Sequence, residues 1–331
     1  MLRVMDVTLR DGSNDIDFRF TAEHTAEIVA GLQAAGVPYI EFGHGLGLGA
    51  HEKTDKKAAA SDEDYAKAAM RVVKEAKVGC FASPRWAERK EIDLLVDHGV
   101  HFVRVGTDVD KVASAQALIE YAKDKGLEVH FSLMKAYAMD VEQLTAQVET
   151  VARYGVDVIH LMDSAGFMLP EAVKKYVGHL TDRVDVPIGF HAHDNLSLSV
   201  ANALAAVGAG AAFVDASLRG LGRSAGNAQI EALIPVFQRQ GIETGIDMLR
   251  LMEVGEKFVV PLMEKTARLD GTEIVFGFAG FHSSFYGLVN EVAKERGLDP
   301  KELVIALCER ERINVDKELV EQIADQLTSV A

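Results

Sequence analysis

The chain has 331 residues, of which 48% are hydrophobic and 26% charged, so it is long enough for one large domain and a smaller appendage. Its formal net charge of −15 argues against a nucleic-acid partner, and no apolar run is long enough to cross a membrane. The distant Cys80 and Cys308 suggest neither a disulfide framework nor a cysteine-rich zinc site, and without a signal-peptide pattern we expect a cytoplasmic protein.

Short apolar runs alternate along the chain with segments of helical periodicity. The first predicted strand covers residues 2–9, leads into Arg10 and Asp11, and is followed by a helix over residues 22–35. Later strands are predicted at residues 38–42, 77–81, 101–105, 128–134, 156–162, 184–193 and 211–216. A helix begins at residues 61–64, others cover residues 86–97, 112–125, 141–154, 170–183 and 196–207, and the last follows residue 226.

This alternation gives eight strand–helix units in about 240 residues, which is the usual size of a closed (β/α)8 barrel, the TIM barrel. Glycines that precede successive strands fit helix C-caps, as Gly36, Gly99, Gly126 and Gly155 do. A barrel of this kind builds its active site at the carboxyl ends of its strands. We therefore predict a barrel domain over residues 1–241, with the functional side chains at one end.

The pattern changes in residues 242–331, where we predict a C-terminal helical domain. Helices are expected at residues 246–263, 284–296, 300–309 and 317–329. Such a domain suits a cap over the barrel, a dimer interface or a docking surface.

His191 and His193 lie two residues apart at the end of the seventh predicted strand. Residues two apart in a strand point to the same face, so the two imidazoles are expected side by side. Together with an aspartate at a neighbouring strand end they would hold a divalent cation and leave positions open for substrate, as a catalytic site requires. These ligands suit manganese, cobalt, magnesium or zinc.

Several motifs together resemble the DRE-TIM metallolyase superfamily, and most of all its 4-hydroxy-2-oxovalerate aldolases. The main matches are residues 6–12 (Asp-Val-Thr-Leu-Arg-Asp-Gly), 163–166 (Asp-Ser-Ala-Gly), 191–198 (His-Ala-His-Asp-Asn-Leu-Ser-Leu), 225–228 (Ala-Gly-Asn-Ala) and 278–280 (Phe-Ala-Gly). The resemblance covers nearly the whole chain, the tail included.

This resemblance implies that Asp11, His191 and His193 bind the metal, for which manganese is the first expectation. It implies that Arg10 stabilises the enolate of pyruvate and that Ser164 binds the substrate carboxylate. Asn227 matches a further ligand of some relatives, and Glu41 is expected to orient other groups rather than bind the metal. The implied reaction makes or cleaves a 4-hydroxy-2-oxo acid.

Two positions depart from the aldolase pattern. The family's catalytic base is a His two residues after the Arg-Asp-Gly motif, and Asn14 stands there. The family's Tyr near the Ser-Phe pair of the tail is replaced by His282. We expect either His282 or a metal-bound water to act as the base, unless His282 only packs, and we place Asn14 and His44 at the aldehyde side of the site. His44 binds the aldehyde or shapes its loop, and a non-standard aldehyde is expected.

Three alternatives stay open: a Claisen-type acyl-CoA condensing enzyme or lyase, a non-catalytic paralogue, and a metal-free aldolase that uses Lys135 as a Schiff-base lysine. The expected small-molecule partners are a 2-oxo acid and an aldehyde. The resemblance also implies a homodimer and a docked acylating aldehyde dehydrogenase. The sequence does not identify the aldehyde or the pathway.

Overall fold

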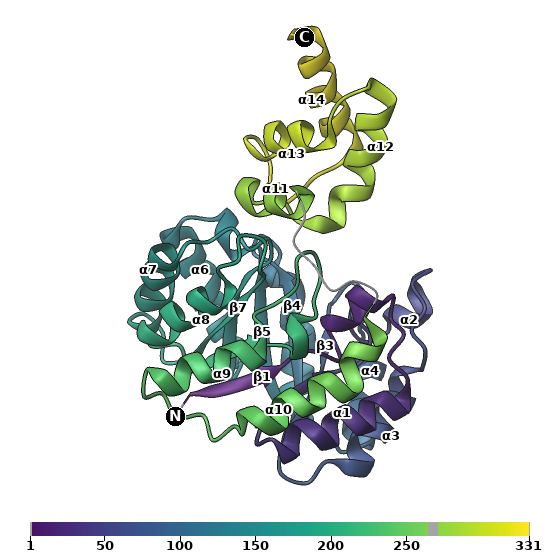
Figure 1. Cartoon of the computed structure of the whole chain (residues 1–331), viewed down its shortest axis with the longest axis vertical. Coiled ribbons are helices and arrows are strands. Elements are labelled where there is room, and N and C mark those ends of the chain that lie inside the picture. The colour runs from purple at the N-terminus through teal and green to yellow at the C-terminus, as the bar shows by residue number, and fades with distance from the viewer. Residues whose placement is uncertain (1, 264–270, 331) are drawn as a thin grey trace.

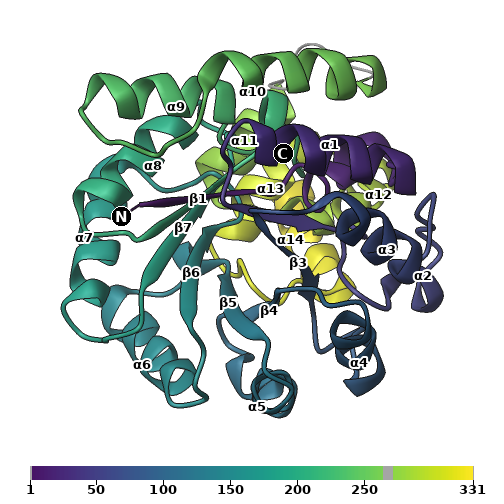
Figure 2. The same ribbon diagram turned by 90° about the horizontal axis from the view of Figure 1, so that it is seen from below.

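A computed structural model of the chain describes residues 2–263 and 271–330 (Figure 1). Eight parallel strands form a closed barrel in sequential order, and β8 is hydrogen-bonded to β1. The strands are β1 (Arg3–Asp6), β2 (Tyr39–Phe42), β3 (Lys77–Ala82), β4 (Phe102–Asp108), β5 (Glu128–Met134), β6 (Val158–Asp163), β7 (Ile188–Ala192) and β8 (Phe213–Ala216). Figure 2 shows the helices arranged around these strands, so the predicted TIM barrel is confirmed.

The barrel helices follow the strands along the chain. They are α1 (Ala22–Ala34), α2 (Ala50–Lys53), α3 (Asp62–Val72), α4 (Arg89–Asp97), α5 (Gln116–Asp124), α6 (Val141–Ala152), α7 (Pro170–Thr181), α8 (Ser199–Gly208) and α9 (Ile230–Arg239). Their apolar faces form one continuous core with the outward faces of the strands. The short helix α2 begins at the end of the glycine-rich segment of residues 43–51 and was not predicted.

The first strand is shorter than predicted because Asp6 turns the chain. Its carboxylate accepts hydrogen bonds from the backbone N–H and the hydroxyl of Thr8, both at 2.9 Å. The Val7 backbone N–H still donates to the Ala216 carbonyl at 2.9 Å, and from Thr8 onward the local bonding takes the place of ladder bonds. Arg10 and Asp11 therefore lie on the turn that follows β1, at the same end of the barrel as the other expected site residues.

The tail contains α10 (Met248–Val254), α11 (Gly271–Ala279), α12 (Tyr286–Arg296), α13 (Pro300–Cys308) and α14 (Lys317–Val330). Helix α11 was not predicted, since its two glycines lower helix propensity. Helices α11–α14 share a hydrophobic core of their own and form a separate lobe in Figure 1.

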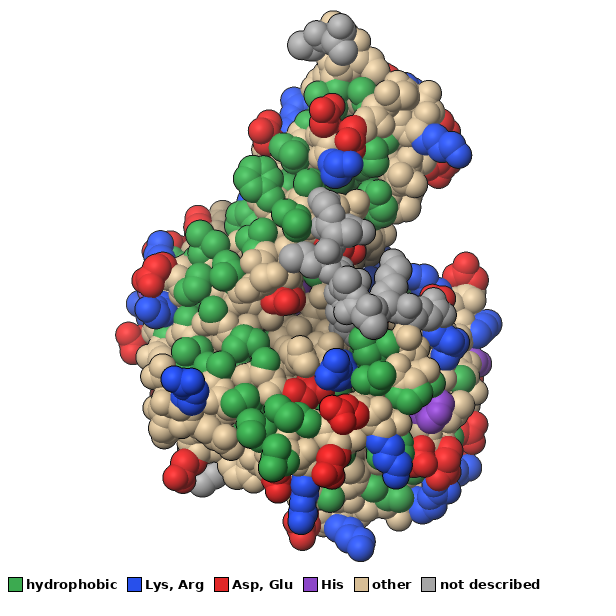
Figure 3. All heavy atoms as spheres, in the orientation of Figure 1, with side chains coloured by type: hydrophobic (Ala, Val, Ile, Leu, Met, Phe, Trp, Pro, Cys, Tyr) green, Lys and Arg blue, Asp and Glu red, His purple; other side chains and the backbone are tan. Residues whose placement is uncertain are grey.

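Helix α10 belongs by its packing to the barrel, because Leu251 and Val254 are part of the barrel core. The proposed domain boundary between residues 241 and 242 stays a prediction, and this packing favours a boundary after α10. Within residues 2–263 and 271–330, no helix combines the length and apolar character that crossing a membrane requires. On the face seen in Figure 3, acidic and basic side chains are interspersed over the barrel.

The lower bore of the barrel contains two stacked histidines, His130 and His160, which are fully buried. His130 Nδ1 lies 3.0 Å from His160 Nε2, and His130 Nε2 lies 2.9 Å from the Glu128 carboxylate at the rim. His160 Nδ1 lies 3.2 Å from Asp215 Oδ1. Gly189 on β7 leaves the space that the His160 ring fills.

We predict that Gly189→Ala destabilises the protein by about 1–3 kcal/mol, because the added methyl group would overpack a filled core. A Cβ at this position would lie 2.6 Å from His160 Nδ1. The measurement is the urea midpoint followed by circular dichroism. Gly178→Ala in α7 is the control, since its Cβ would meet its nearest neighbour at 3.9 Å, and equal midpoints for the two variants would contradict the prediction.

Candidate active site

Asp11, His191 and His193 meet at the carboxyl end of the barrel. One potential ligand atom from each residue lies within 4.8 Å of the others, and all three residues are buried. His191 is on β7, and His193 lies just past the strand, where it forms an isolated bridge to Asn227. The two Nε2 atoms are 3.4 Å apart, so the side-by-side arrangement predicted from the His-x-His spacing is confirmed.

Hydrogen bonds fix the tautomers of both imidazoles. His191 Nδ1 lies 3.0 Å from the Asp215 carboxylate, and His193 Nδ1 lies 3.1 Å from the Gly226 carbonyl. Since both partners are acceptors, each Nδ1 carries the proton, and each Nε2 presents a lone pair. Two lone pairs and the Asp11 carboxylate therefore converge in one buried space.

This donor set fits a divalent cation. Two nitrogens bound to one ion with bonds of ~2.1 Å lie ~3.0–3.4 Å apart between octahedral and tetrahedral angles, and the observed separation of 3.4 Å falls in that range. A cation would also relieve the repulsion between the two lone pairs. Asn227 Nδ2 donates to Asp11 Oδ2 at 2.9 Å and to the Leu221 carbonyl at 2.9 Å. Its Oδ1 is buried without a hydrogen-bond partner in the described chain, which suits a further ligand.

A ladder of alternating charges runs beneath the three residues. Arg10 donates to Asp11 at 2.8 Å and to Glu41 at 2.5 Å. Arg104 donates twice to Glu41, at 2.7 and 2.5 Å, and donates again to Asp215. Asp215 in turn accepts from His191. Both Glu41 and Arg104 are fully buried, so the expected orienting role of Glu41 has a structural basis.

The ladder sets the charge of each group. Burial alone would raise the pKa of Asp11, but Arg10 and His193 outweigh it and hold that pKa well below its usual range. Burial acts in the same sense on Glu41, where Arg10 and Arg104 lower the pKa instead. Burial lowers the pKa of His193 to about 4. The carboxylates are therefore ionised and His193 is neutral at neutral pH, as metal ligation requires.

A cleft of about 720 Å³ opens above this centre. Arg10, Asp11, His193, Ser164 and His282 all line it, so the structure brings together five of the residues chosen from the sequence. Arg10 Nη2 is buried without a hydrogen-bond partner in the described residues. Ser164 Oγ accepts the Lys135 backbone N–H at 3.0 Å, which leaves its own hydroxyl proton to donate.

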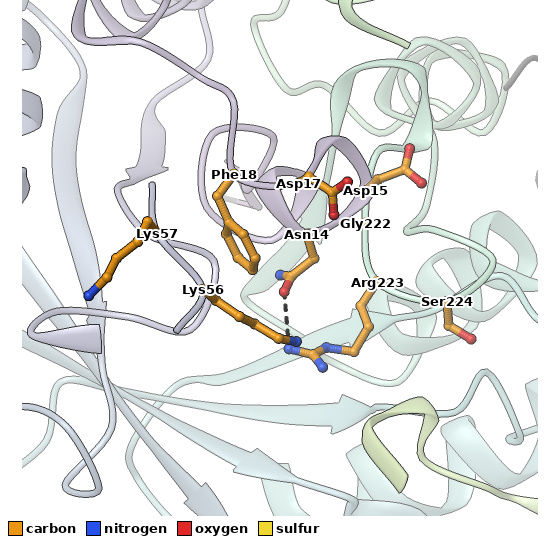
Figure 4. Close-up of a pocket in the computed structure, with 9 residues that line it drawn as sticks. All are labelled: Asn14, Asp15, Asp17, Phe18, Lys56, Lys57, Gly222, Arg223 and Ser224. Carbon is orange, nitrogen blue, oxygen red and sulfur yellow. Dashed lines mark hydrogen bonds between the residues drawn. The ribbon is translucent and has the colours of Figure 1, made fainter. Parts of the chain in front are cut away.

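His44 and Asn14 lie outside the lining of this cleft. His44 Nε2 lies 2.7 Å from the Lys56 carbonyl, and its Nδ1 accepts the Leu46 backbone N–H at 3.0 Å. Both ring nitrogens thus bind backbone, which favours the alternative that His44 shapes its loop. Asn14 Oδ1 accepts from Arg223 at 3.2 Å and lines a separate hollow of about 410 Å³ (Figure 4). The substrate-binding role given to these two residues stays a prediction.

Lys135 lines the cleft but is held by polar partners. Its ammonium donates to Asp108 at 3.2 Å and to the Ile313 carbonyl at 2.8 Å, and it lies over the Phe285 ring. These contacts join the barrel to the tail. They give Lys135 a structural role, which explains its place at the cleft without Schiff-base chemistry.

Comparison with known proteins agrees with this geometry. The HMGL-like family matches residues 1–258, which is most of the chain. The chain belongs to the HMGL-like family. This family contains divalent-metal-dependent aldolases, and the predicted resemblance is confirmed.

The curated relatives of this HMGL-like chain match it over almost its full length. It is 38% identical over 326 residues to 4-hydroxy-2-oxovalerate aldolase 2 of Rhodococcus jostii (strain RHA1). The matched region covers 98% of this chain and 95% of that relative. It is 39% identical over 326 residues to 4-hydroxy-2-oxovalerate aldolase of Moorella thermoacetica, with 98% and 96% covered. The chain is therefore an aldolase of the HMGL-like family, a carbon–carbon lyase.

Solved structures support the fold alone, because their sequence identity is low. The carboxyl transferase domain of Rhizobium etli pyruvate carboxylase with pyruvate superposes with a TM-score of 0.81 at 14% identity, covering 99% of this chain and 61% of that chain. HMG-CoA lyase of Bacillus subtilis gives 0.70 at 19% identity, covering 82% and 96%. The first match extends through the tail as well as the barrel.

Sequence reasoning missed Arg104 and gave Asp215 no role, although Asp215 lies in the last predicted strand. A signal was present at Arg104, since a lone arginine in the apolar run Phe-Val-Arg-Val must find buried acceptors. Arg223 was also missed. Its backbone N–H donates to Asp11 at 3.3 Å.

We predict that Asp215→Asn weakens Mn²⁺ binding about 10–100-fold, because an amide neither fixes the His191 tautomer nor raises its basicity as a carboxylate does. Isothermal titration with Mn²⁺ measures the effect, and circular dichroism checks that the variant folds. Asp157→Asn is the matched control, since Asp157 pairs with Lys123 at the surface. Equal affinities in the two variants would count against the assigned role of Asp215.

Proposed function

We propose that the chain is a divalent-metal-dependent aldolase that makes or cleaves a 4-hydroxy-2-oxo acid through the enolate of pyruvate. The observation that carries this proposal is the buried set of Asp11, His191 and His193 beside the unpaired Arg10 Nη2. Asp11, His191, His193 and Asn227 would hold the cation, with manganese preferred over cobalt, magnesium or zinc. When bound, the cation supplies Lewis-acid stabilisation of negative charge on the 2-oxo oxygen.

In cleavage, the bond between C3 and C4 breaks and its electron pair stays on C3. The proton of the 4-hydroxyl goes to a base, and C4 leaves as the aldehyde carbonyl. Arg10 donates from Nη2 to the developing enolate oxygen, and Ser164 donates its hydroxyl proton to the substrate carboxylate. The enolate then takes a proton at C3 to give pyruvate.

His282 is the proposed base, in place of the family's His at the position where this chain has Asn14. Its Nδ1 lies 2.7 Å from Ser284 Oγ. If Nδ1–H donates to that hydroxyl, Nε2 carries the lone pair that accepts the proton. The backbone N–H of Ser284 lies 3.3 Å from Nδ1 and favours the opposite tautomer, so the role of base depends on the shorter contact.

The two changed positions, Asn14 and His282, support a non-standard aldehyde, since both belong to the aldehyde half of the aldolase site. The resemblance also supports a homodimer and a docked acylating aldehyde dehydrogenase. Ile274 and Phe278, one turn apart on α11, are 46% and 65% exposed. They give the tail an apolar surface on which such a partner could pack.

The test of this function is proton–deuterium exchange at the methyl group of pyruvate in D2O. We expect exchange with Mn²⁺ and its loss with EDTA, because the enolate forms only when its charge is stabilised. Nuclear magnetic resonance follows the methyl signal. No exchange with Mn²⁺ present would contradict the proposal and favour the Claisen-type enzyme or the non-catalytic paralogue.

We predict that His282→Ala lowers kcat/KM for cleavage about 100-fold or more, the usual effect of losing a general base. Burial, together with Arg223 and Lys135, holds the pKa of His282 well below its usual range. His282 is therefore fully unprotonated between pH 8 and pH 6.5, and the wild-type rate should fall only below that range.

His179→Ala, on α7 away from the cleft, is the matched control and should keep the wild-type rate. A wild-type pH profile in which half of the activity is lost near pH 6.5, or an active His282→Ala variant, would exclude His282 as the base.

A further inference from the structure

We propose that the aldehyde handled by this site is bulky and apolar, of the aromatic class, rather than a two-carbon aldehyde. This inference rests on the proposed aldolase function and concerns the part of the cleft beyond the metal centre. It follows from the size of the cleft and from the apolar side chains in its walls.

The cleft is larger than a small hydroxy-oxo acid requires. Its volume of about 720 Å³ lies in the range of about 300–1,000 Å³ in which proteins hold drug-sized ligands. Arg10, Asp11, His193 and Ser164 occupy its inner end and account for the pyruvate half. The remaining space extends outward from the carbon that becomes the aldehyde.

The walls of that outer space come from four strand ends and the tail, and they carry apolar side chains among polar ones. The apolar side chains include Leu46, Phe81, Trp86, Met134, Met162 and Phe285. Aromatic rings and thioethers pack well against a flat apolar ring. Leu46, Trp86, Met134 and Phe285 are only partly buried, so a ligand ring would remove further apolar surface from water.

Some of the cations near this space have acidic partners, whereas Arg85 is exposed and lies 5.6 Å from the centre of the Trp86 ring. Lys135 lies 3.2 Å and Lys111 3.7 Å from Asp108, and Arg10 pairs with Asp11 and Glu41. Arg223, at the edge of the cleft, is hydrogen-bonded to Asn14 on the side of the other hollow. The preference for a neutral aldehyde therefore rests on the apolar side chains, and the charged aldehyde glyoxylate tests it.

A two-carbon aldehyde would touch few of these side chains and leave most of the apolar wall in contact with water. Its transition state would then lack contacts that a ring makes. Burying one ring of the substrate in the transition state should raise kcat/KM about tenfold or more over that of a two-carbon aldehyde.

The experiment compares condensation of pyruvate with benzaldehyde and with acetaldehyde in the Mn²⁺-loaded full-length enzyme. We expect kcat/KM for benzaldehyde to exceed that for acetaldehyde by about tenfold or more. Trp86→Ala should lower this ratio at least about fivefold, since the variant removes one apolar wall. Comparing ratios cancels the intrinsic reactivity of the two aldehydes.

Leu249→Ala is the matched control, because Leu249 is an exposed apolar side chain on α10 that should leave the ratio unchanged. Thermal unfolding checks that Trp86→Ala is folded. Metal-dependent pyruvate exchange combined with a preference for acetaldehyde, or for the charged aldehyde glyoxylate, would overturn this inference alone. An unchanged ratio in a folded Trp86→Ala variant would also overturn it, whereas absence of exchange would overturn the aldolase proposal itself.

Discussion

The pairing of Glu41 with two arginines is the interaction on which the rest of the site depends. A carboxylate with no solvent exposure is strongly disfavoured unless cations and hydrogen bonds compensate it, and Arg10 and Arg104 supply both. Each arginine then continues to a second carboxylate, Asp11 or Asp215. Removing one member would leave an uncompensated charge inside the barrel, so the ladder is held in one arrangement. Asp11 and His191, which are proposed as metal ligands, lie at its two ends, and both are oriented by the same buried network.

The division between barrel and tail places the proposed reaction at a junction. In that proposal, strand ends supply the groups for the pyruvate half, and the segment between α11 and α12 supplies His282. Lys135 joins the two parts through Asp108 on one side and the Ile313 carbonyl on the other. The geometry at C4 of the substrate therefore depends on how the tail is seated, whereas enolate stabilisation depends on the barrel alone.

The barrel and the pairing of His191 with His193 were predictable because they follow local rules. Strand–helix alternation specified the fold, and the spacing of His191 and His193 placed both rings on one face. The end of β1 was not predicted, since it depends on the Asp6 side chain. The partnership of Arg104 with Glu41 and Asp215 joins three strands, and inward-facing residues meet according to the stagger of the closed barrel, which no local pattern contains. The positions of His44 and Asn14 outside the cleft likewise depend on how their loops fold back.

Below the ladder, His130 and His160 stand in line between two carboxylates, those of Glu128 and Asp215. Three gaps separate the four groups, and each gap needs one proton to become a hydrogen bond, whereas two neutral imidazoles bring only two. Burial lowers the pKa of His160 to about 4, so the third proton is absent at neutral pH. The gap left open is the one beside Asp215, where His160 Nδ1 and Asp215 Oδ1 lie 3.2 Å apart without a hydrogen bond. Because the third proton is missing, the Asp215 carboxylate accepts hydrogen bonds from Arg104 and His191 and none from His160.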